Sequence, residues 1–371
     1  MKIKDICNSV TDGSHNPPRG IEYSEYMMLS SKNIYDDEIT FDEPRYLTDE
    51  DFKREHKRTN ISEGDVLLTI VGTVGRTAIV DKNMPIFTLQ RSVAVLHPKQ
   101  ELCLGRFLMY ALRGKRTYIE NHAKGVAQKG IYLGEVSDID LKLPDIVEQE
   151  QIIKILDNVC EIIKLRKLEL RSLDNLIKAR FVELFGSEQE FDKWPCCTIG
   201  DVAEVCVGVV IKPTQYYAEK GIPAFRSLNI GEMKVKDSDW VYFTEVGHMK
   251  NQKSVIRTND VLVVRSGAPG TACVATEKYN GYNAVDIIIA HPNQKKVNSI
   301  FLAGFTNMPH GMNQIKGGTG GAAQQHFNVG GYKAMTLIMP PIELQQQFAV
   351  FVAQIEKSKV VVFNPIYYYN K

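Results

Sequence analysis

Two loops of similar composition carry side chains suited to contacting a nucleic acid, at 124–129 in the first half of the chain and at 321–326 in the second. Glycine lets a backbone approach another strand closely, glutamine can pair with adenine through two hydrogen bonds, and lysine neutralises phosphate. A flexible connection would explain the glycines equally well, so the interpretation depends on the polar residues. These candidates are Lys124, Gln128, Lys129, Gln324, Gln325 and His326.

Two glycine turns, at 72–75 and 267–270, each have an arginine beside them. Turn geometry alone explains the glycines. Of the residues at these two turns, we therefore predict a DNA contact only for Arg76 and Arg265. A wider basic stretch between Arg106 and Lys129 fits a solvated helix surface just as well.

Motifs that would indicate an enzyme occur only as isolated matches. Residues 364–367 resemble the sequence with which adenine methyltransferases hold a flipped base, and residues 16–19 resemble it less well. Residues 318–323 fit a dinucleotide-binding glycine pattern, but no strand followed by an acidic residue frames them. The sequence contains no P-loop, no Cys/His metal cluster and no nucleophile elbow. We therefore predict a non-catalytic protein that binds no cofactor itself.

Composition is that of a two-domain globular protein. The chain has 371 residues, of which 44% are hydrophobic and 24% charged. Its seven cysteines form no C-x-x-C pair, so we expect reduced thiols. No apolar run reaches the roughly 18 residues of a membrane span, and the first residues lack a signal-peptide core, so we expect a cytoplasmic protein. With a net charge of +1, any DNA-binding surface must come from local clustering.

An internal repeat with an offset of 194 to 196 residues is the most informative feature. Each match alone is weak, but many matches in the same order at one offset indicate two homologous modules. Asp65 and Asp260 belong to the repeat and precede apolar strands, which favours turn capping over metal binding. We expect structural roles for His97 and His291. The matches include 64–67 with 259–262, 72–75 with 267–270, 97–98 with 291–292, and Gln149 with Gln345.

Each module has the same predicted anatomy. Short β-branched runs at 66–71, 91–96, 261–264 and 285–290 predict strands. Helical segments at 105–121 and 299–313 follow, then a glycine-rich loop, and a proline-flanked helix closes each copy.

The first closing helix is predicted over 145–187. Asp145 and Glu148 form a capping pattern at its start, and Gly186 can cap its end. About 40 helical residues would extend ~60 Å, and a stripe with a seven-residue period requires a partner helix. Packing on its own domain is the alternative. The stripe contains Ile152, Leu156, Val159, Ile163, Leu170, Leu173, Ile177 and Leu184, with Arg166 and Arg180 at two of its positions.

The second closing helix begins in the same way but is predicted to be truncated. Phe348, Val352 and Ile355 continue the stripe, whereas Lys359 replaces the residue equivalent to Ile163. Pro365 lacks an amide donor and clashes with the preceding turn. We therefore predict a helix over 341–363 and a non-helical tail over 364–371.

The repeat, the Pro-x-Ile-x-x-Gln start of both helices (144–149 and 340–345) and the opening stretch 11–17 resemble the specificity (S) subunits of Type I restriction–modification systems. The resemblance covers essentially the whole chain except its last few residues. It implies an α/β (mixed α+β) fold with two target-recognition domains, 1–144 and 188–340. The helices over 145–187 and 341–363 would form an antiparallel coiled coil between the domains.

The same resemblance implies a function and partners. Each domain would bind one half of a split double-stranded DNA target, and the helices would bind two methyltransferase subunits, with restriction subunits joining through them. S-adenosylmethionine is expected on the methyltransferase, which modifies adenine. By likeness to the family, the opening loops add Ser14, His15, Arg19 and Lys212 as candidate DNA contacts.

Two other interpretations remain open. A truncated variant or decoy would bind the methyltransferase without supporting modification, because its shortened second helix weakens docking. A stand-alone nuclease is a distant third.

Overall fold

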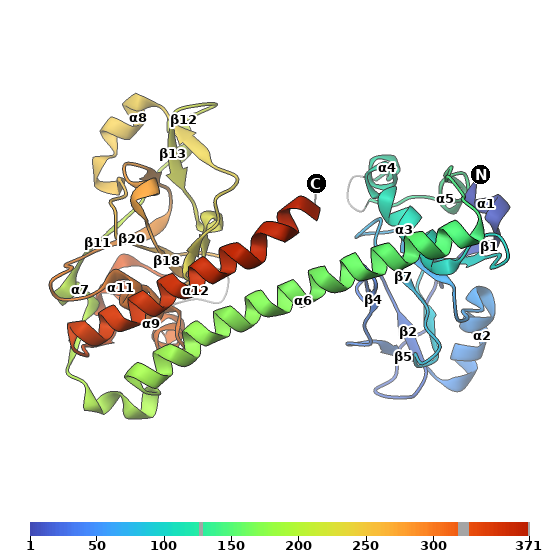
Figure 1. The fold of residues 1–371 in the computed structure, drawn as a ribbon, viewed down its shortest axis with the longest axis horizontal. Coiled ribbons are helices and arrows are strands. Elements are labelled where there is room, and N and C mark those ends of the chain that lie inside the picture. Colours follow the sequence, from blue (N-terminus) through green and yellow to red (C-terminus); the bar gives the residue numbers. More distant parts are fainter. Residues whose placement is uncertain (126–128, 318–325, 370–371) are drawn as a thin grey trace. The chain divides into compact units, whose positions relative to one another are not determined.

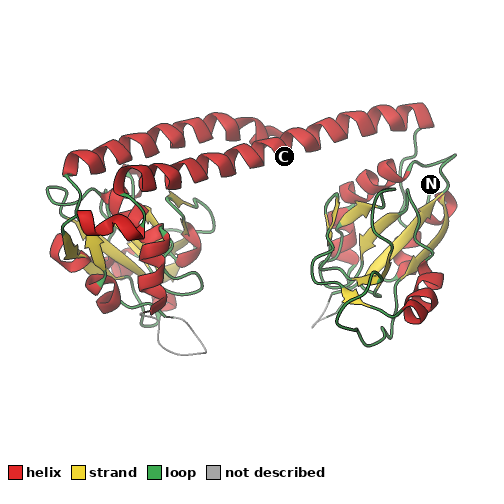
Figure 2. Ribbon diagram, turned by 90° about the horizontal axis from the view of Figure 1, so that it is seen from below, coloured by secondary structure: helices red, strands yellow, loops and turns green. Residues whose placement is uncertain are grey.

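The computed structural model describes the backbone of residues 1–125, 129–317 and 326–369, and side chains within these ranges as far as residue 360. The candidates Gln128, Gln324 and Gln325 lie outside the described residues. Contacts divide the chain into two compact units, Met1–Ile163 (unit 1) and Lys164–Lys371 (unit 2). The predicted mixed α/β class is confirmed (Figures 1 and 2). In the described part of the chain, no helix is both long and apolar enough to cross a membrane.

Unit 1 contains an antiparallel four-stranded sheet in the order β1-β9-β6-β7, a three-stranded sheet in the order β5-β2-β8, and the hairpin β3-β4. In the three-stranded sheet, β2 and β8 run parallel. The strands are β1 (Cys7–Asp12), β2 (Met27–Leu29), β3 (Ile34–Tyr35), β4 (Glu38–Ile39), β5 (Arg45–Tyr46), β6 (Val66–Thr69), β7 (Thr77–Ile79), β8 (Phe87–Leu89) and β9 (Val93–Pro98). The helices are α1 (Ile3–Ile6), α2 (Asp49–Thr59), α3 (Gly105–Gly114), α4 (Arg116–His122), α5 (Leu133–Ser137) and the start of α6 (Ile146–Phe185).

Unit 2 repeats this arrangement and adds β12 and the two-stranded sheet β10-β21. The sheet β11-β20-β17-β18 matches β1-β9-β6-β7, and the parallel pair β13-β19 matches β2-β8. Its strands are β10 (Cys196–Thr198), β11 (Ala203–Val207), β12 (Tyr217–Ala218), β13 (Ile222–Phe225), β14 (Ile230–Gly231), β15 (Lys234–Val235), β16 (Val241–Phe243), β17 (Val261–Val264), β18 (Ala272–Val274), β19 (Asn283–Ala284), β20 (Ile287–Pro292) and β21 (Thr336–Ile338). The internal repeat predicted from the sequence is therefore a repeat of topology.

The helices of unit 2 lie on the corresponding segments. They are α7 (Ile199–Val202), α8 (Glu245–Lys250), α9 (Ser299–Asn307), α10 (Pro309–Gly317), α11 (Val329–Ala334) and α12 (Ile342–Tyr369), with the end of α6. Short 3-10 turns are η1 (Glu188–Lys193), η2 (Pro213–Tyr216), η3 (Ser227–Asn229), η4 (Gln252–Ser254) and η5 (Glu277–Tyr279).

The central strands lack polar alternation because both faces of each sheet are buried. In unit 1, Val66 and Leu68 pack into the core beneath α3, while Leu67 packs into a second core on the other face. In unit 2, Val261 and Leu262 divide between two cores in the same way. A continuous aliphatic run is what such a strand requires.

The first closing helix is one unbroken helix, α6, with both predicted caps. The Asp145 carboxylate accepts from the Glu148 amide at 2.9 Å, and Gly186 adopts φ 91° beyond the last turn. In unit 1 its first turns pack on that unit's own core through Ile152 and Leu156. There Asp157 also accepts from Arg106 at 2.6 Å. This part of the stripe follows the alternative of packing on its own domain.

In unit 2 the last turns of α6 pack against α12 (Figures 1 and 2). Phe181 meets Phe348 at a ring-centroid distance of 5.4 Å, and the Lys359 ammonium donates to Asp174 at 2.6 Å. Residue numbers thus rise along α6 as they fall along α12, so the two helices are antiparallel as predicted. Lys359 is therefore paired at the position where the apolar stripe ends.

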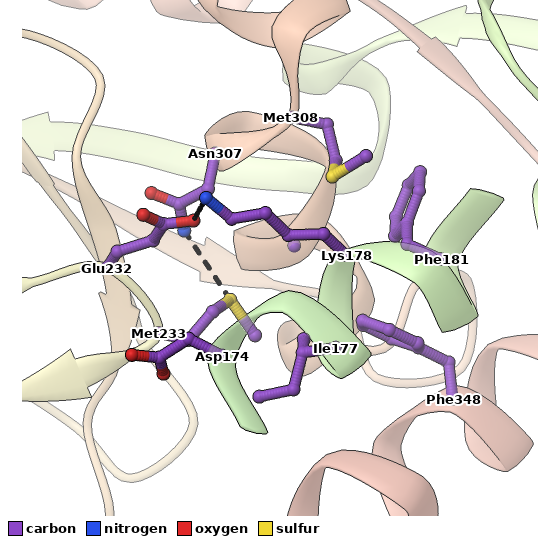
Figure 3. Close-up of a pocket in the computed structure, with 10 residues that line it drawn as sticks. Asp174, Ile177, Lys178, Phe181, Glu232, Met233, Asn307, Met308 and Phe348 are labelled. Atoms are coloured by element: carbon purple, nitrogen blue, oxygen red, sulfur yellow. Dashed lines mark hydrogen bonds and ion pairs between the residues drawn. The ribbon is translucent and has the colours of Figure 1, made fainter. Parts of the chain in front are cut away.

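Figure 3 shows how this part of α6 is held in unit 2. Lys178 forms an ion pair with Glu232 at 2.8 Å, and Ile177 and Phe181 line the same small pocket. Phe348 enters from α12. The pocket is a packing seam between elements of unit 2.

The predicted end of the second helix at residue 363 was wrong. Helix α12 runs for 28 residues, from Ile342 to Tyr369, and includes Pro365. A proline removes one hydrogen bond and strains the preceding turn, and this local cost did not end the helix. Helix α12 is nevertheless shorter than the 40 residues of α6.

The glutamine of the repeated Pro-x-Ile-x-x-Gln motif joins each closing helix to its unit. Gln149 is fully buried, accepts from the Leu104 amide at 2.9 Å and donates to the Leu102 carbonyl at 2.8 Å. Gln345 is equally buried, accepts from the Asn298 amide at 2.9 Å and donates to the Pro340 carbonyl at 2.8 Å. The glutamine side chain therefore bonds to the backbone at the start of α3 in unit 1 and at the start of α9 in unit 2.

The repeated histidines form a second shared feature of the two units, in which each bonds to the aspartate that precedes a central strand. These bonds support their structural roles. His97 bonds to Asp65 at 2.9 Å, and His291 bonds to Asp260 at 2.6 Å. Asp260 also accepts from the Arg257 amide at 2.6 Å, so it caps a turn as predicted. The bonds of His291 to Asp260 and to Cys206 raise the pKa of the imidazole to about 9.

Replacing Gln345 with leucine should lower the free energy of unfolding of unit 2 by about 2–4 kcal/mol, because it leaves the buried Asn298 amide and Pro340 carbonyl without partners. Both tryptophans, Trp194 and Trp240, lie in unit 2, so their fluorescence during urea denaturation reports this unit. The matched control is Gln346→Leu at an exposed position of the same helix. Equal stability of the two variants would contradict this role.

Unit 2 should also lose stability as the pH rises from about 6.5 to about 9. Below the ordinary value of 6.5, His291 is charged whether folded or unfolded, so its stabilisation is fully present. As pH rises through about 9 the folded imidazole loses its proton, and up to ~3 kcal/mol disappears. Urea denaturation followed by tryptophan fluorescence measures the slope, which His291→Gln should flatten. A variant that kept the wild-type slope would rule out His291 as its source.

Candidate nucleic-acid interface

Three loops meet at one edge of the central sheet in unit 1. We call them the opening loop (13–19), the glycine turn (72–75) and the glycine-rich loop, of which the structure describes residues 124–125 and 129–130. The Arg91 amide donates to the Ser14 carbonyl at 2.9 Å, which ties the opening loop to the segment before β9. The next residue, Ser92, accepts from the Ile70 amide at 2.9 Å. The Gly72 amide then donates to the Lys129 carbonyl at 3.0 Å, which closes the group.

Unit 2 brings the equivalent loops together with equivalent bonds. Its opening loop is 208–213, its glycine turn is 267–270, and of its glycine-rich loop the structure describes residues 326–327. The Asp286 amide donates to the Val209 carbonyl at 3.2 Å, and the Phe327 amide donates to the Arg265 carbonyl at 3.0 Å. Arg265 also donates to the Asp286 carboxylate at 2.6 Å. We refer to each group as a three-loop surface.

Glycines are required at the turns for a backbone reason. Gly72 and Gly75 have φ of 84° and 94°, and Gly267 and Gly270 have φ of 87° and 94°. These left-handed values disfavour any residue with a Cβ atom. The repeat therefore preserves the shape of the turn in both units.

The surface of unit 1 is rich in cations. Arg76, Arg116 and Lys129 line one hollow beside the glycine turn. Arg76 stacks 4.9 Å from the ring of Tyr35, and Arg116 is held by Asp36 and by the Gly75 carbonyl. Burial alone would raise the pKa of Asp36, but the hydrogen bond and charge of Arg116 outweigh it, so this pKa is lowered. Lys129 is exposed.

Lys124 lies at the stem of the glycine-rich loop, where its backbone pairs with Gly130. Its ammonium donates to Glu135 at 2.8 Å, and this bond raises the pKa of Lys124. Because the side chain is 70% exposed, the ion pair is weak and the lysine remains accessible.

The described residues of the surface in unit 2 carry less charge. Arg265 is largely buried, because it spans Asp286 and the Phe327 carbonyl. His326 is exposed and bonds to the Ser266 hydroxyl at 2.8 Å. Lys212 is exposed in the opening loop, with φ 45°. Arg265 therefore holds the loops together, whereas the side chains of His326 and Lys212 are exposed to solvent.

The three candidates of the opening loop in unit 1 differ in exposure. Ser14 is buried, and its amide donates to the Leu89 carbonyl at 2.8 Å, so it frames the loop from inside. His15 is half exposed and bonds to Asp12 at 2.7 Å, a carboxylate that also holds Arg58. Arg19 is exposed.

Arg76 and Arg265 are not equivalent, although the sequence places both beside glycine turns. The Gly75 amide donates to Thr69 as the Gly270 amide donates to Val264, at 2.9 and 3.0 Å. This register puts Arg265 just before its turn and Arg76 just after its own. The similar composition of the two turns suggested that Arg76 and Arg265 occupy equivalent positions, but the backbone bonds place them on opposite sides of the turn.

Sequence reasoning missed two positions that the bonds place in the surfaces. Arg91 in unit 1 and Asp286 in unit 2 donate their amides to the opening loop in the same way. Both lie before the last long strand of the sheet, at an offset of 195. Residue type could not have revealed this match, because arginine and aspartate are opposite in charge. Only the shared offset within the repeat could have revealed it.

Comparison with known proteins points to one family. Residues 1–174 match the Type I restriction modification DNA specificity domain. The chain is 27% identical over 153 residues to the EcoBI specificity subunit of Escherichia coli, a match covering 41% of this chain and 31% of that protein. It is 22% identical over 222 residues to the MjaVIII specificity subunit of Methanocaldococcus jannaschii, covering 56% and 51%. These matches thus span about half or less of the relatives' length.

Solved structures resemble the fold over nearly the whole chain. A crystal structure of a Type I S subunit from M. genitalium aligns with a TM-score of 0.54 at 12% identity, covering 98% of this chain and 91% of that one. A structure from a study of assembly and conformational transition in a Type I system aligns with a TM-score of 0.53 at 15% identity and the same coverage. At these identities the likeness concerns the fold.

The frame of the opening loop leaves no room for a side chain at Gly13. A Cβ atom there would overlap the Leu89 carbonyl, a backbone group that cannot move aside. Gly13→Ala should therefore destabilise unit 1 by at least ~2 kcal/mol. Gly114→Ala, at a helical glycine with open space around it, is the control and should be neutral or slightly stabilising. Hydrogen exchange of unit 1 peptides distinguishes them, and unchanged protection in Gly13→Ala would refute the tight frame.

Proposed function

Because this chain belongs to the specificity subunits of Type I restriction–modification systems, we propose that it recognises a DNA target in two separate halves, one with each unit. The observation that carries this proposal is the repeated three-loop surface. The backbone frame is the same in both units, while the side chains on it differ. A protein that meets two different sequences on one duplex needs this combination.

The chemistry of the two surfaces supports different half-sites. In unit 1, Arg76, Arg91 and Lys129 offer cations for phosphates, and an arginine can pair with guanine through two hydrogen bonds. In unit 2, His326 and Lys212 provide fewer charges. The half-site of unit 1 therefore depends more on electrostatic attraction.

The helices would serve assembly. In this proposal residues 1–144 and 188–340 are the target-recognition domains, and α6 with α12 forms the spacer that binds two methyltransferase subunits. Exposed apolar side chains on α6, such as Ile155, Ile162 and Leu165, are suited to such a contact. The methyltransferase supplies S-adenosylmethionine and modifies adenine, restriction subunits join the complex, and the assembly works in the cytoplasm.

The test is to mix the chain with its methyltransferase and S-adenosylmethionine, add genomic DNA, and map the methylated adenines. We expect one two-part motif with a constant gap. Arg91→Ala should relax the sequence requirement in one half alone, because Arg91 belongs only to the surface of unit 1. The exposed Lys82, outside the three loops, gives the control variant Lys82→Ala.

Other outcomes would favour the competing interpretations. A tight complex with the methyltransferase that leaves DNA unmodified would identify a decoy. Magnesium-dependent cleavage of DNA by the chain alone would identify a nuclease. A change in both halves of the motif on Arg91→Ala would contradict the division of labour between units.

A further inference from the structure

The tip of the opening loop in unit 2 carries two apolar side chains in solvent. Ile211 is 79% exposed and Val210 is 47% exposed. Lys212 follows in the left-handed region with φ 45°, and Pro213 begins the turn η2. Exposed β-branched residues beside a cation are suited to a ligand that combines an apolar group with a negative charge.

Contacts on both sides of the tip hold the opening loop on unit 2. A Cβ atom at Gly208 would lie 2.7 Å from the Ala284 carbonyl group, and the Val209 amide donates to that carbonyl at 2.8 Å. Beyond the tip, Tyr216 packs against Phe243 with ring centroids 5.9 Å apart. Both ends of the loop are therefore fixed within unit 2.

A chain of hydrogen bonds connects this tip to the rest of the three-loop surface. Val209 accepts from Asp286, which binds Arg265, and Arg265 binds Phe327 next to His326. In unit 1 the equivalent bond reaches Ser14, so His15 and Asn16 occupy the positions of Val210 and Ile211. The same loop is polar in one unit and apolar in the other.

We propose that Ile211 contacts the C5 methyl group of a thymine in the half-site recognised by unit 2, with Lys212 on a neighbouring phosphate. This inference rests on the proposed function. Thymine is the base that presents a methyl group in the major groove, and apolar side chains recognise it by excluding water. The lysine supplies attraction to the backbone without sequence preference.

Uracil tests the contact, because it pairs like thymine and lacks only the methyl group. The target is first selected from random duplexes with the complex of chain and methyltransferase, and each thymine of the unit 2 half is then replaced by uracil. Wild-type affinity should fall about fourfold at one position, the factor for burying one methyl group. Ile211→Ala should show that loss with thymine and no further loss with uracil, and Ile211→Val should retain most of the discrimination.

The control is Ile86→Ala, which shortens an isoleucine that is 65% exposed in unit 1, outside the three loops. It should leave every uracil effect as in the wild type. If Ile211→Ala and the wild type respond alike to uracil at every position, the contact does not exist. Suppose instead that Ile211→Ala lowers affinity equally for the thymine and the uracil duplexes and also abolishes DNA bending. Ile211 would then be a wedge inserted between base pairs, and the thymine contact would be refuted. Failure to select any two-part target would refute the proposed function itself.

Discussion

The ends of β6 and β17 impose the constraint on which both three-loop surfaces depend. Backbone amides and carbonyls next to buried strands must find partners, because an unpaired buried group costs about as much as a lost hydrogen bond. In unit 1 the residues after β6 bond to Ser92, Lys129 and Ile131. In unit 2 Arg265 bonds to Phe327 in the same way. Loops from distant parts of the sequence are thus fixed at one place by main-chain bonds, which leaves their side chains free to differ.

A second constraint connects each unit to its closing helix. Gln149 and Gln345 are fully buried side chains whose amides fit one donor and one acceptor of the main chain. Because an amide offers both a donor and an acceptor, glutamate or leucine could not make both bonds. Movement of either helix would therefore pull on the start of α3 or α9, elements that cover the central sheets.

Local patterns made much of this fold predictable. The glycine turns, the caps of α6 and the buried strands follow from a few neighbouring residues, and the repeat revealed the shared topology. What the sequence could not give was the setting of each candidate, which depends on distant residues or on register. Ser14 is buried because β8 lies against its loop, and Arg76 and Arg265 differ in register despite similar composition. The end of α12 was predicted wrongly because the local effect of Pro365 on a helix was treated as decisive. Gln128, Gln324 and Gln325 lie outside the described residues, so their roles stay predictions.

The exchange of Arg91 for Asp286 shows how one frame yields two different surfaces. Both residues donate the same backbone bond, so the frame does not depend on their side chains. In unit 2 the Asp286 carboxylate neutralises Arg265 within the surface, whereas in unit 1 Arg91 is exposed. Exposed cations attract any duplex and lose strength with salt, while short-range apolar and hydrogen-bonding contacts discriminate between bases. In the proposed function, the two units would therefore divide affinity and selectivity unequally, through substitutions that leave the backbone bonds unchanged.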